Sequence, residues 1–205
     1  MKNIDNVKFQ DIKNTFKDVK EDSKDINIKN RFSYNIFLIG FMGVGKTTVS
    51  SFLSSLMNMK EIDIDNHIET VENMTVSEIF NKFGEKYFRD CETRTLIELK
   101  EKQSMIVSCG GGIVLKEENI NLMRTQGKII LLTASPKTIF ERVRYSTDRP
   151  ILNNNMNIEF ISSLMEKRSK KYLSAADLII DTNNKSVEKV CEDIIEELAK
   201  LNHSF

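Results

Sequence analysis

Residues 36–57 read IFLIGFMGVGKTTVSSFLSSLM, and this stretch decides the fold. Residues 36–39 form a short apolar run that predicts a buried strand, and residues 49–57 have the spacing of an amphipathic helix. Between them, residues 40–47 fit the pattern G-x-x-x-x-G-K-[ST]. Its glycines let backbone N–H groups face phosphates, and the following helix adds its positive N-terminus. The stretch therefore predicts a phosphate-binding loop between a strand and a helix.

The two polar side chains of this loop suit a nucleotide with its metal ion. Lys46 supplies a charge that can bridge the β- and γ-phosphates, and the Thr47 hydroxyl is a hard ligand for Mg²⁺. A glycine-rich turn that binds nothing would need neither side chain. The residues expected to contact the nucleotide are Gly43, Val44, Gly45, Lys46, Thr47 and Thr48.

Composition limits the size and the partners of the protein. The 205 residues suffice for one substantial core, and the 30 basic and 30 acidic residues give a formal charge of zero. This balance argues against nucleic-acid and anionic-membrane partners. Three widely spaced cysteines form neither a disulfide framework nor a zinc site, and no apolar run reaches the roughly 20 residues of a membrane span. We expect a cytoplasmic monomer.

The chain divides into a polar extension and a body. Residues 1–34 are rich in Lys, Asp and Asn, and residues 35–205 are expected to form the single domain. Within the extension, Phe9, Ile12, Phe16 and Val19 recur at helical spacing. They fit either a frayed solvated helix or a helix that docks on the body or on another subunit.

The body alternates short apolar runs with longer amphipathic segments, which is typical of a parallel sheet covered by helices. The expected strands are residues 36–39, 61–63, 105–108, 128–132 and 177–181. Three helix starts are marked by capping residues at Thr75, Ser135 and Ser186. Gly84 is expected to break a long helical segment, and the Asn-rich residues 152–157 predict a mobile loop.

Four further polar motifs follow the loop. Asp63 and Asp65 are expected on one side of an extended backbone at the end of a strand, although D-x-D is also common in surface turns. Residues 84–89 read GEKYFR, residues 108–112 read SCGGG, and residues 147–152 read TDRPIL. Three consecutive glycines at a strand end let a ligand approach the backbone closely.

These motifs, in this order and with Arg168 in a later helix, resemble those of the shikimate kinase family from residue 35 to about residue 201. The resemblance implies an α/β P-loop NTPase-type three-layer fold. Its parallel sheet would have five strands in the order 2-3-1-4-5, with helices on both faces and a mobile lid. It implies transfer of the ATP γ-phosphate to the 3-hydroxyl of shikimate, in the pathway to chorismate and aromatic amino acids. ATP and Mg²⁺ are the implied cofactors.

The resemblance also implies roles for single residues. Lys46, Asp65 and Arg149 would be catalytic, and Arg142 and Arg149 would contact the nucleotide, Arg142 against adenine. Thr47, Asp63 and Ser108 would hold the metal. The residues implied for shikimate binding are Asp65, Arg89, Gly110, Gly111, Gly112 and Arg168.

Physical chemistry agrees with these roles without replacing the resemblance. Arginine matches a carboxylate through two hydrogen bonds better than lysine does, although each arginine alone could be a solvated cation. Asp65 is either a general base or only orients the hydroxyl. The segment 169–172 reads SKKY and departs from the family pattern, so the helix that carries Arg168 could continue differently. The alternatives are a gluconate kinase, a nucleoside monophosphate kinase, or a nucleotide-binding module without turnover.

Overall fold

The five strands form one parallel sheet in the computed structural model, which describes residues 32–144 and 157–202. The strands are β1 (Asn35–Ile39), β2 (Lys60–Asp63), β3 (Met105–Ser108), β4 (Gly127–Thr133) and β5 (Leu178–Asp181). Their order is β2-β3-β1-β4-β5, and every neighbouring pair is parallel. The predicted fold class and strand order are confirmed, and each strand boundary lies within one residue of its expected place.

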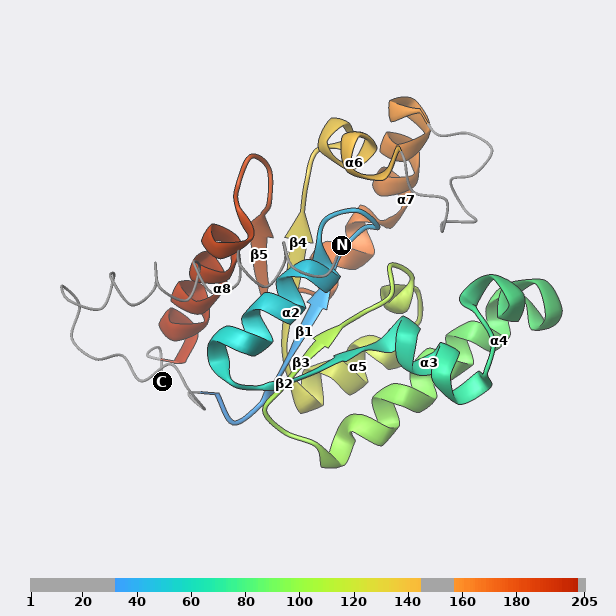
Figure 1. Cartoon of the computed structure of the whole chain (residues 1–205), viewed down its shortest axis with the longest axis horizontal. Helices are drawn as coiled ribbons and strands as arrows, with labels where there is room; N and C mark the ends of the chain where they lie inside the picture. The colour runs from blue at the N-terminus through green and yellow to red at the C-terminus, as the bar shows by residue number, and fades with distance from the viewer. Residues whose placement is uncertain (1–31, 145–156, 203–205) are drawn as a thin grey trace, which may run out of the picture.

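Helices cover both faces of this sheet (Figure 1). They are α2 (Lys46–Met57), α3 (Ile64–Glu72), α4 (Val76–Glu98), α5 (Glu117–Gln126), α6 (Pro136–Val143), α7 (Ile158–Ala175) and α8 (Val187–Asn202), with short 3₁₀ turns η2 (Leu99–Glu101) and η3 (Ile113–Leu115). In Figure 1, α2 and α8 lie on one side of the sheet, and α3, α4 and α5 lie on the other. None of the described helices is long and apolar enough to cross a membrane.

The sheet separates two hydrophobic cores because neighbouring residues of a strand point to opposite faces. In β1, Ile36 and Leu38 join the core beneath α2, α6 and α8, whereas Phe37 and Ile39 join the core beneath α3, α4 and α5. All four side chains are fully buried. A central parallel strand buried on both faces reads as a continuous apolar run, which is how β1 appears in the sequence.

The predicted helix signals are present. Thr75 and Glu78 form a reciprocal capping box at the start of α4, and the Ser135 side chain accepts a hydrogen bond from the Thr138 N–H ahead of Pro136. Ser186 accepts one from the Lys189 N–H at the start of α8. Gly84 has φ 81° and ψ 170°, so it kinks α4 as expected.

The body includes residues ahead of the boundary expected at residue 35. Phe32 is 1% exposed and packs in the core beneath α2, and its carbonyl accepts a hydrogen bond from Ser104. The apolar stripe of residues 9–19 and most of the predicted mobile loop lie outside the described residues.

Candidate active site

A cavity of about 1100 Å³ opens at the carboxyl ends of the central strands. This is the edge of a parallel sheet where ligands bind in α/β proteins. It contains every predicted site residue within the described part of the chain, from the loop at 43–48 to Arg168. Arg149 lies outside the described residues. A volume above the usual range of a single-ligand pocket leaves room for a nucleotide and an acceptor together.

The phosphate loop follows β1 and leads into α2, as its sequence pattern predicts. Gly45 precedes α2 with φ 100° and gives it no side-chain cap, so the first N–H groups of the helix face the cavity. The Lys46 ammonium lies over the loop and donates to the carbonyls of Gly40 (2.9 Å) and Phe41 (3.1 Å). The loop therefore presents backbone donors, a helix N-terminus and one ammonium group to the same space.

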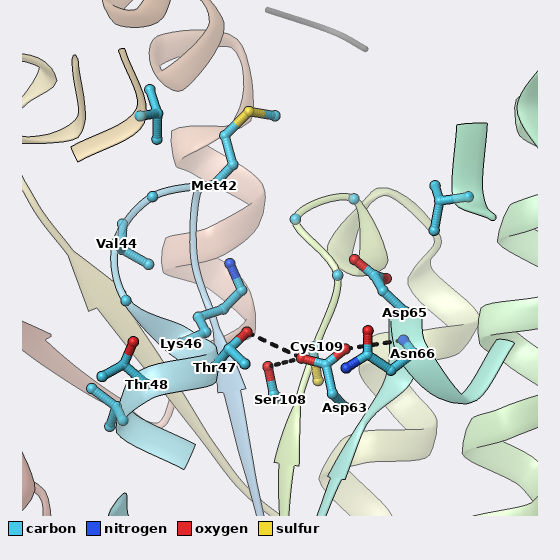
Figure 2. Close-up of a pocket in the computed structure, with 18 of the residues that line it drawn as sticks. Met42, Val44, Lys46, Thr47, Thr48, Asp63, Asp65, Asn66, Ser108 and Cys109 are labelled. Atoms are coloured by element: carbon cyan, nitrogen blue, oxygen red, sulfur yellow. Dashed lines mark hydrogen bonds between the residues drawn. The ribbon is translucent and has the colours of Figure 1, made fainter. Parts of the chain in front are cut away.

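Asp63 forms hydrogen bonds with Thr47 and Ser108, the other two residues predicted to hold a metal (Figure 2). Its Oδ2 accepts hydrogen bonds from the Thr47 hydroxyl at 3.1 Å and the Ser108 hydroxyl at 2.9 Å. Its Oδ1 accepts the N–H of Asn66 at 3.2 Å and so caps α3. One carboxylate and two hydroxyls form the oxygen-rich donor set that Mg²⁺ prefers, with room for water and phosphate oxygens.

The expected extended backbone from Asp63 to Asp65 is wrong. The strand ends at Asp63, which becomes the N-cap of α3, and Asp65 lies in the first turn of that helix. A carboxylate at an N-cap satisfies a free N–H group, and this favours a helix over a longer strand. Asp65 still lines the cavity together with Asp63.

Asp65 lies in an environment that disfavours its charge. Burial, and next the charge of Asp63, raise the pKa of Asp65 from 3.8 to about 6, although Lys46 and Arg89 act in the opposite direction. Its Oδ1 is buried and has no hydrogen-bond partner among the described residues. A hydroxyl group of a ligand would satisfy this oxygen.

Arg89 comes from the second half of α4 and is held by two carboxylates. Its Nη2 donates to Glu85 at 2.8 Å, and its Nη1 donates to Glu92 at 2.9 Å. Glu92 is fully buried, and burial raises its pKa to about 7 despite the Arg89 charge. Sequence reasoning missed Glu92, since a glutamate three residues after an arginine on a helix usually faces solvent.

The triple glycine leaves space for these charged groups. A Cβ at Gly110 would lie 2.5 Å from Asp65 Oδ1 and 2.8 Å from Glu92 Oε1, and a Cβ at Gly112 would collide with the Arg89 guanidinium. Any larger residue at either position would displace a charged side chain. The glycines are therefore needed where Asp65, Glu92 and Arg89 converge.

Arg168 reaches the cavity from α7. Its Nη1 donates to the Gly111 carbonyl at 3.3 Å, and the Tyr172 hydroxyl donates to the same carbonyl. The helix continues to Ala175, so the unusual segment 169–172 is accommodated within an unbroken α7. Arg89 and Arg168 thus line one cavity, and both lie next to the glycine turn.

Arg142 lies at the other end of the cavity, beside the phosphate loop. Its Nη1 donates to the Val44 carbonyl and to the Thr182 hydroxyl, both at 3.1 Å, and its Nη2 donates to the Thr182 carbonyl at 2.9 Å. Thr182 also lines the cavity, although no sequence pattern marks it. The contact of Arg142 with adenine stays a prediction.

Comparisons with known proteins agree with this geometry. The family model described as shikimate kinase matches residues 42–199. A shikimate kinase of Thermodesulfovibrio yellowstonii is 40% identical over 169 residues, which are 82% of this chain and 97% of that protein. A solved shikimate kinase from Acinetobacter baumannii in complex with shikimate has a TM-score of 0.78 at 28% identity, covering 82% of this chain and 94% of that one. The shikimate kinase from Aquifex aeolicus gives a TM-score of 0.70 at 36% identity, covering 80% of this chain and 96% of that one.

Proposed function

The chain belongs to the shikimate kinase family and is an ATP-dependent kinase of the shikimate pathway, and we propose how its residues divide the work. The reaction moves the γ-phosphoryl group of ATP to the 3-hydroxyl of shikimate and gives shikimate 3-phosphate and ADP. The single observation that carries the proposal is the shared cavity, which joins the phosphate loop to Asp65, Arg89 and Arg168.

The nucleotide half of the site holds the phosphates. The loop N–H groups and the N-terminus of α2 bind the β-phosphate, and Lys46 leaves the carbonyls of Gly40 and Phe41 to contact the transferring group. Phosphoryl transfer needs little covalent help, so an oriented positive charge is the main contribution of the side chain. Arg142 contacts the adenine end.

Thr47, Asp63 and Ser108 would hold Mg²⁺, directly or through water. A Mg²⁺ ion held by these residues would offset the negative charge that develops on the phosphate groups. The hydrogen bonds that join the three side chains through Asp63 Oδ2 keep their oxygens together. Asp63 in addition fixes the start of α3, and with it the position of Asp65.

The acceptor half binds shikimate by its carboxylate and its hydroxyls. Arg89 and Arg168 line the cavity and bind the carboxylate, since a planar guanidinium can hold it through two hydrogen bonds. Glu85 and Glu92 fix the Arg89 side chain before the ligand arrives. Gly110, Gly111 and Gly112 line the pocket and let the acid approach the backbone.

Asp65 acts on the hydroxyl that attacks phosphorus. Its unpartnered Oδ1 accepts the hydroxyl hydrogen and sets the direction of attack. With a pKa near 6, Asp65 is largely ionised at pH 7 and is able to take the proton as the bond to phosphorus forms. Arg149 is proposed as the third catalytic residue on the family resemblance alone, as a positive charge that contacts the phosphates.

Acceptor selectivity tests the proposal directly. Consumption of ATP is measured with shikimate, gluconate and nucleoside monophosphates as separate acceptors, with and without Mg²⁺. Of the three acceptors, we expect only shikimate to be phosphorylated, and only when Mg²⁺ is present. Turnover with gluconate or with a nucleotide would overturn the acceptor assignment, and ATP binding without any turnover would indicate a binding module.

We also propose that the residues ahead of the buried Phe32 form an appendage to the kinase domain and that the protein is a cytoplasmic monomer. Cys91, Cys109 and Cys191 are buried and free, as expected in a reducing compartment. Size-exclusion chromatography of the full chain tests the oligomeric state.

A further inference from the structure

Thr182 follows β5, is 2% exposed, and has no role in the chemistry described above. Its hydroxyl oxygen lies 3.2 Å from the Val44 carbonyl of the phosphate loop and 3.0 Å from the Thr133 carbonyl at the end of β4. Arg142 donates to the same hydroxyl at 3.1 Å. The Thr182 hydroxyl therefore joins the phosphate loop, the end of β4 and the segment between β5 and α8.

The Val44 carbonyl matters because of the group on the other side of its peptide bond. A peptide unit is planar and trans, so the Val44 carbonyl and the Gly45 N–H point in opposite directions. A carbonyl held toward Arg142 and Thr182 therefore leaves the Gly45 N–H pointing to the opposite side. Loops that bind phosphate through backbone N–H groups depend on this orientation.

Local contacts hold the residues on both sides of the peptide between Val44 and Gly45: the Val44 N–H lies 3.4 Å from the Phe41 carbonyl, and the Gly45 carbonyl accepts the Val49 N–H at 2.9 Å. Gly45 has φ 100°, and the position that its Cβ would occupy has no heavy atom within 4 Å, apart from its immediate chain neighbours. Glycine has more backbone conformations open to it than other residues, so a hydrogen bond from outside the loop to the Val44 carbonyl adds to the contacts that fix the orientation of this peptide. Within residues 32–144 and 157–202, Arg142 and Thr182 donate to the Val44 carbonyl from outside the loop.

The two donors are not equivalent. Arg142 is exposed and is also the residue expected to contact adenine, so its hydrogen bonds to the loop compete with that contact. The Thr182 hydroxyl is buried. It accepts a hydrogen bond from Arg142, and its single hydrogen is shared between the Val44 and Thr133 carbonyls. The Thr133 carbonyl also accepts the Thr182 N–H at 2.8 Å, which leaves the hydroxyl hydrogen available to Val44. A hydrogen bond accepted from Arg142 strengthens the hydroxyl as a donor.

We propose that Thr182 is a positioning residue for ATP, whose hydroxyl holds the Val44 carbonyl outward so that the Gly45 N–H faces the β-phosphate. Its effect reaches the nucleotide through the phosphate loop and not by direct contact with the base. The inference rests on the proposed ATP-dependent function.

The test removes the hydroxyl and keeps the shape of the side chain. We expect Thr182→Val to weaken ADP binding about two- to tenfold, the effect of one hydrogen bond. Adenosine, which lacks phosphates, should bind as it does to the parent, and the KM for shikimate should not change. Thr182→Ser keeps the hydroxyl and should restore ADP binding. Dissociation constants are measured by titration calorimetry on the full chain.

Thr133→Val is the matched control, because its hydroxyl lies at the same end of the sheet and contacts Ile180 instead of the loop. It should bind ADP as the parent does. Parent-like ADP binding by Thr182→Val, or equal losses for ADP and adenosine, would overturn the proposal. If Thr182→Val does not fold, Thr182→Ala and Thr182→Ser give the same comparison. A parent that binds no ADP would instead overturn the proposed function.

Discussion

Replacing Asp65 by Asn is expected to stabilise the ligand-free protein at pH 8 while removing kinase activity. Burial, and next the charge of Asp63, raise the pKa of Asp65 from 3.8 to about 6. Between about pH 4 and pH 6, Asp65 in the folded protein therefore keeps a proton that the unfolded chain has already released. This contribution to stability is fully present below about pH 4 and is lost as the pH rises through about 6.

The size of the effect follows from the change in pKa. One pKa unit is worth about 1.4 kcal/mol, so the ionised Asp65 costs the folded state on the order of 3 kcal/mol at pH 8. Asn has nearly the same shape and no charge. The stability gain of Asp65→Asn should therefore be about 3 kcal/mol at pH 8 and about half of that at pH 5.

Urea denaturation of both proteins at pH 5, 6 and 8, without nucleotide or acceptor, measures this difference. Asp63→Asn is the control, because Asp63 accepts hydrogen bonds from Thr47, Ser108 and Asn66 and should lose stability when its charge is removed. A stability gain of Asp65→Asn that is equal at pH 5 and pH 8 would refute the argument from ionisation. So would the absence of any gain at pH 8.

Four further outcomes are expected. Lys46→Ala should lower kcat about 10²- to 10³-fold with an unchanged melting temperature, as for the loss of one oriented charge, and near-normal turnover would contradict its role. Arg89→Lys should raise the KM for shikimate far more than the KM for ATP, because lysine keeps the charge and loses the planar fork. Arg89→Ala should weaken binding of shikimate strongly but weaken binding of its carboxamide analogue only slightly. Equal losses of affinity for the acid and the amide would show that Arg89 does not contact the carboxylate. Removal of residues 1–31, which retains the buried Phe32, should leave kcat and the KM for both substrates within about twofold of the parent; loss of activity or aggregation would show that the segment is part of the folded body.

The strands and helix starts could be predicted because their signals are local. The continuous apolar run of β1 and the residues around Thr75 and Ser135 determine nearby backbone without reference to the rest of the chain. The order of the strands in the sheet could not be predicted from such local signals. No periodicity in the sequence indicated that β3 pairs with β1, and the expected order came from the family resemblance alone.

The residues that sequence reasoning missed act through contacts between distant segments. Glu92 is 27 positions from Asp65 and has the same spacing to Arg89 as any solvent-exposed ion pair, and only its burial distinguishes it. Thr182 and Val44 are 138 positions apart. The wrong expectation for Asp65 had a local cause, since a D-x-D pattern fits a strand end and a helix N-cap equally well.

The two cores on opposite faces of the sheet divide the residues of the proposed active site into two groups. The side chains proposed for the acceptor come largely from α3 and α4 over one core, and those for the nucleotide come from α2, α6 and the segment before α8 over the other. Within the described part of the chain, the two cores meet only at the strands of the sheet and at α7, which contributes Ile161 to one and Tyr172 and Ala175 to the other. Selection for a new acceptor can therefore act on one half of the protein while the half that uses ATP is inherited unchanged.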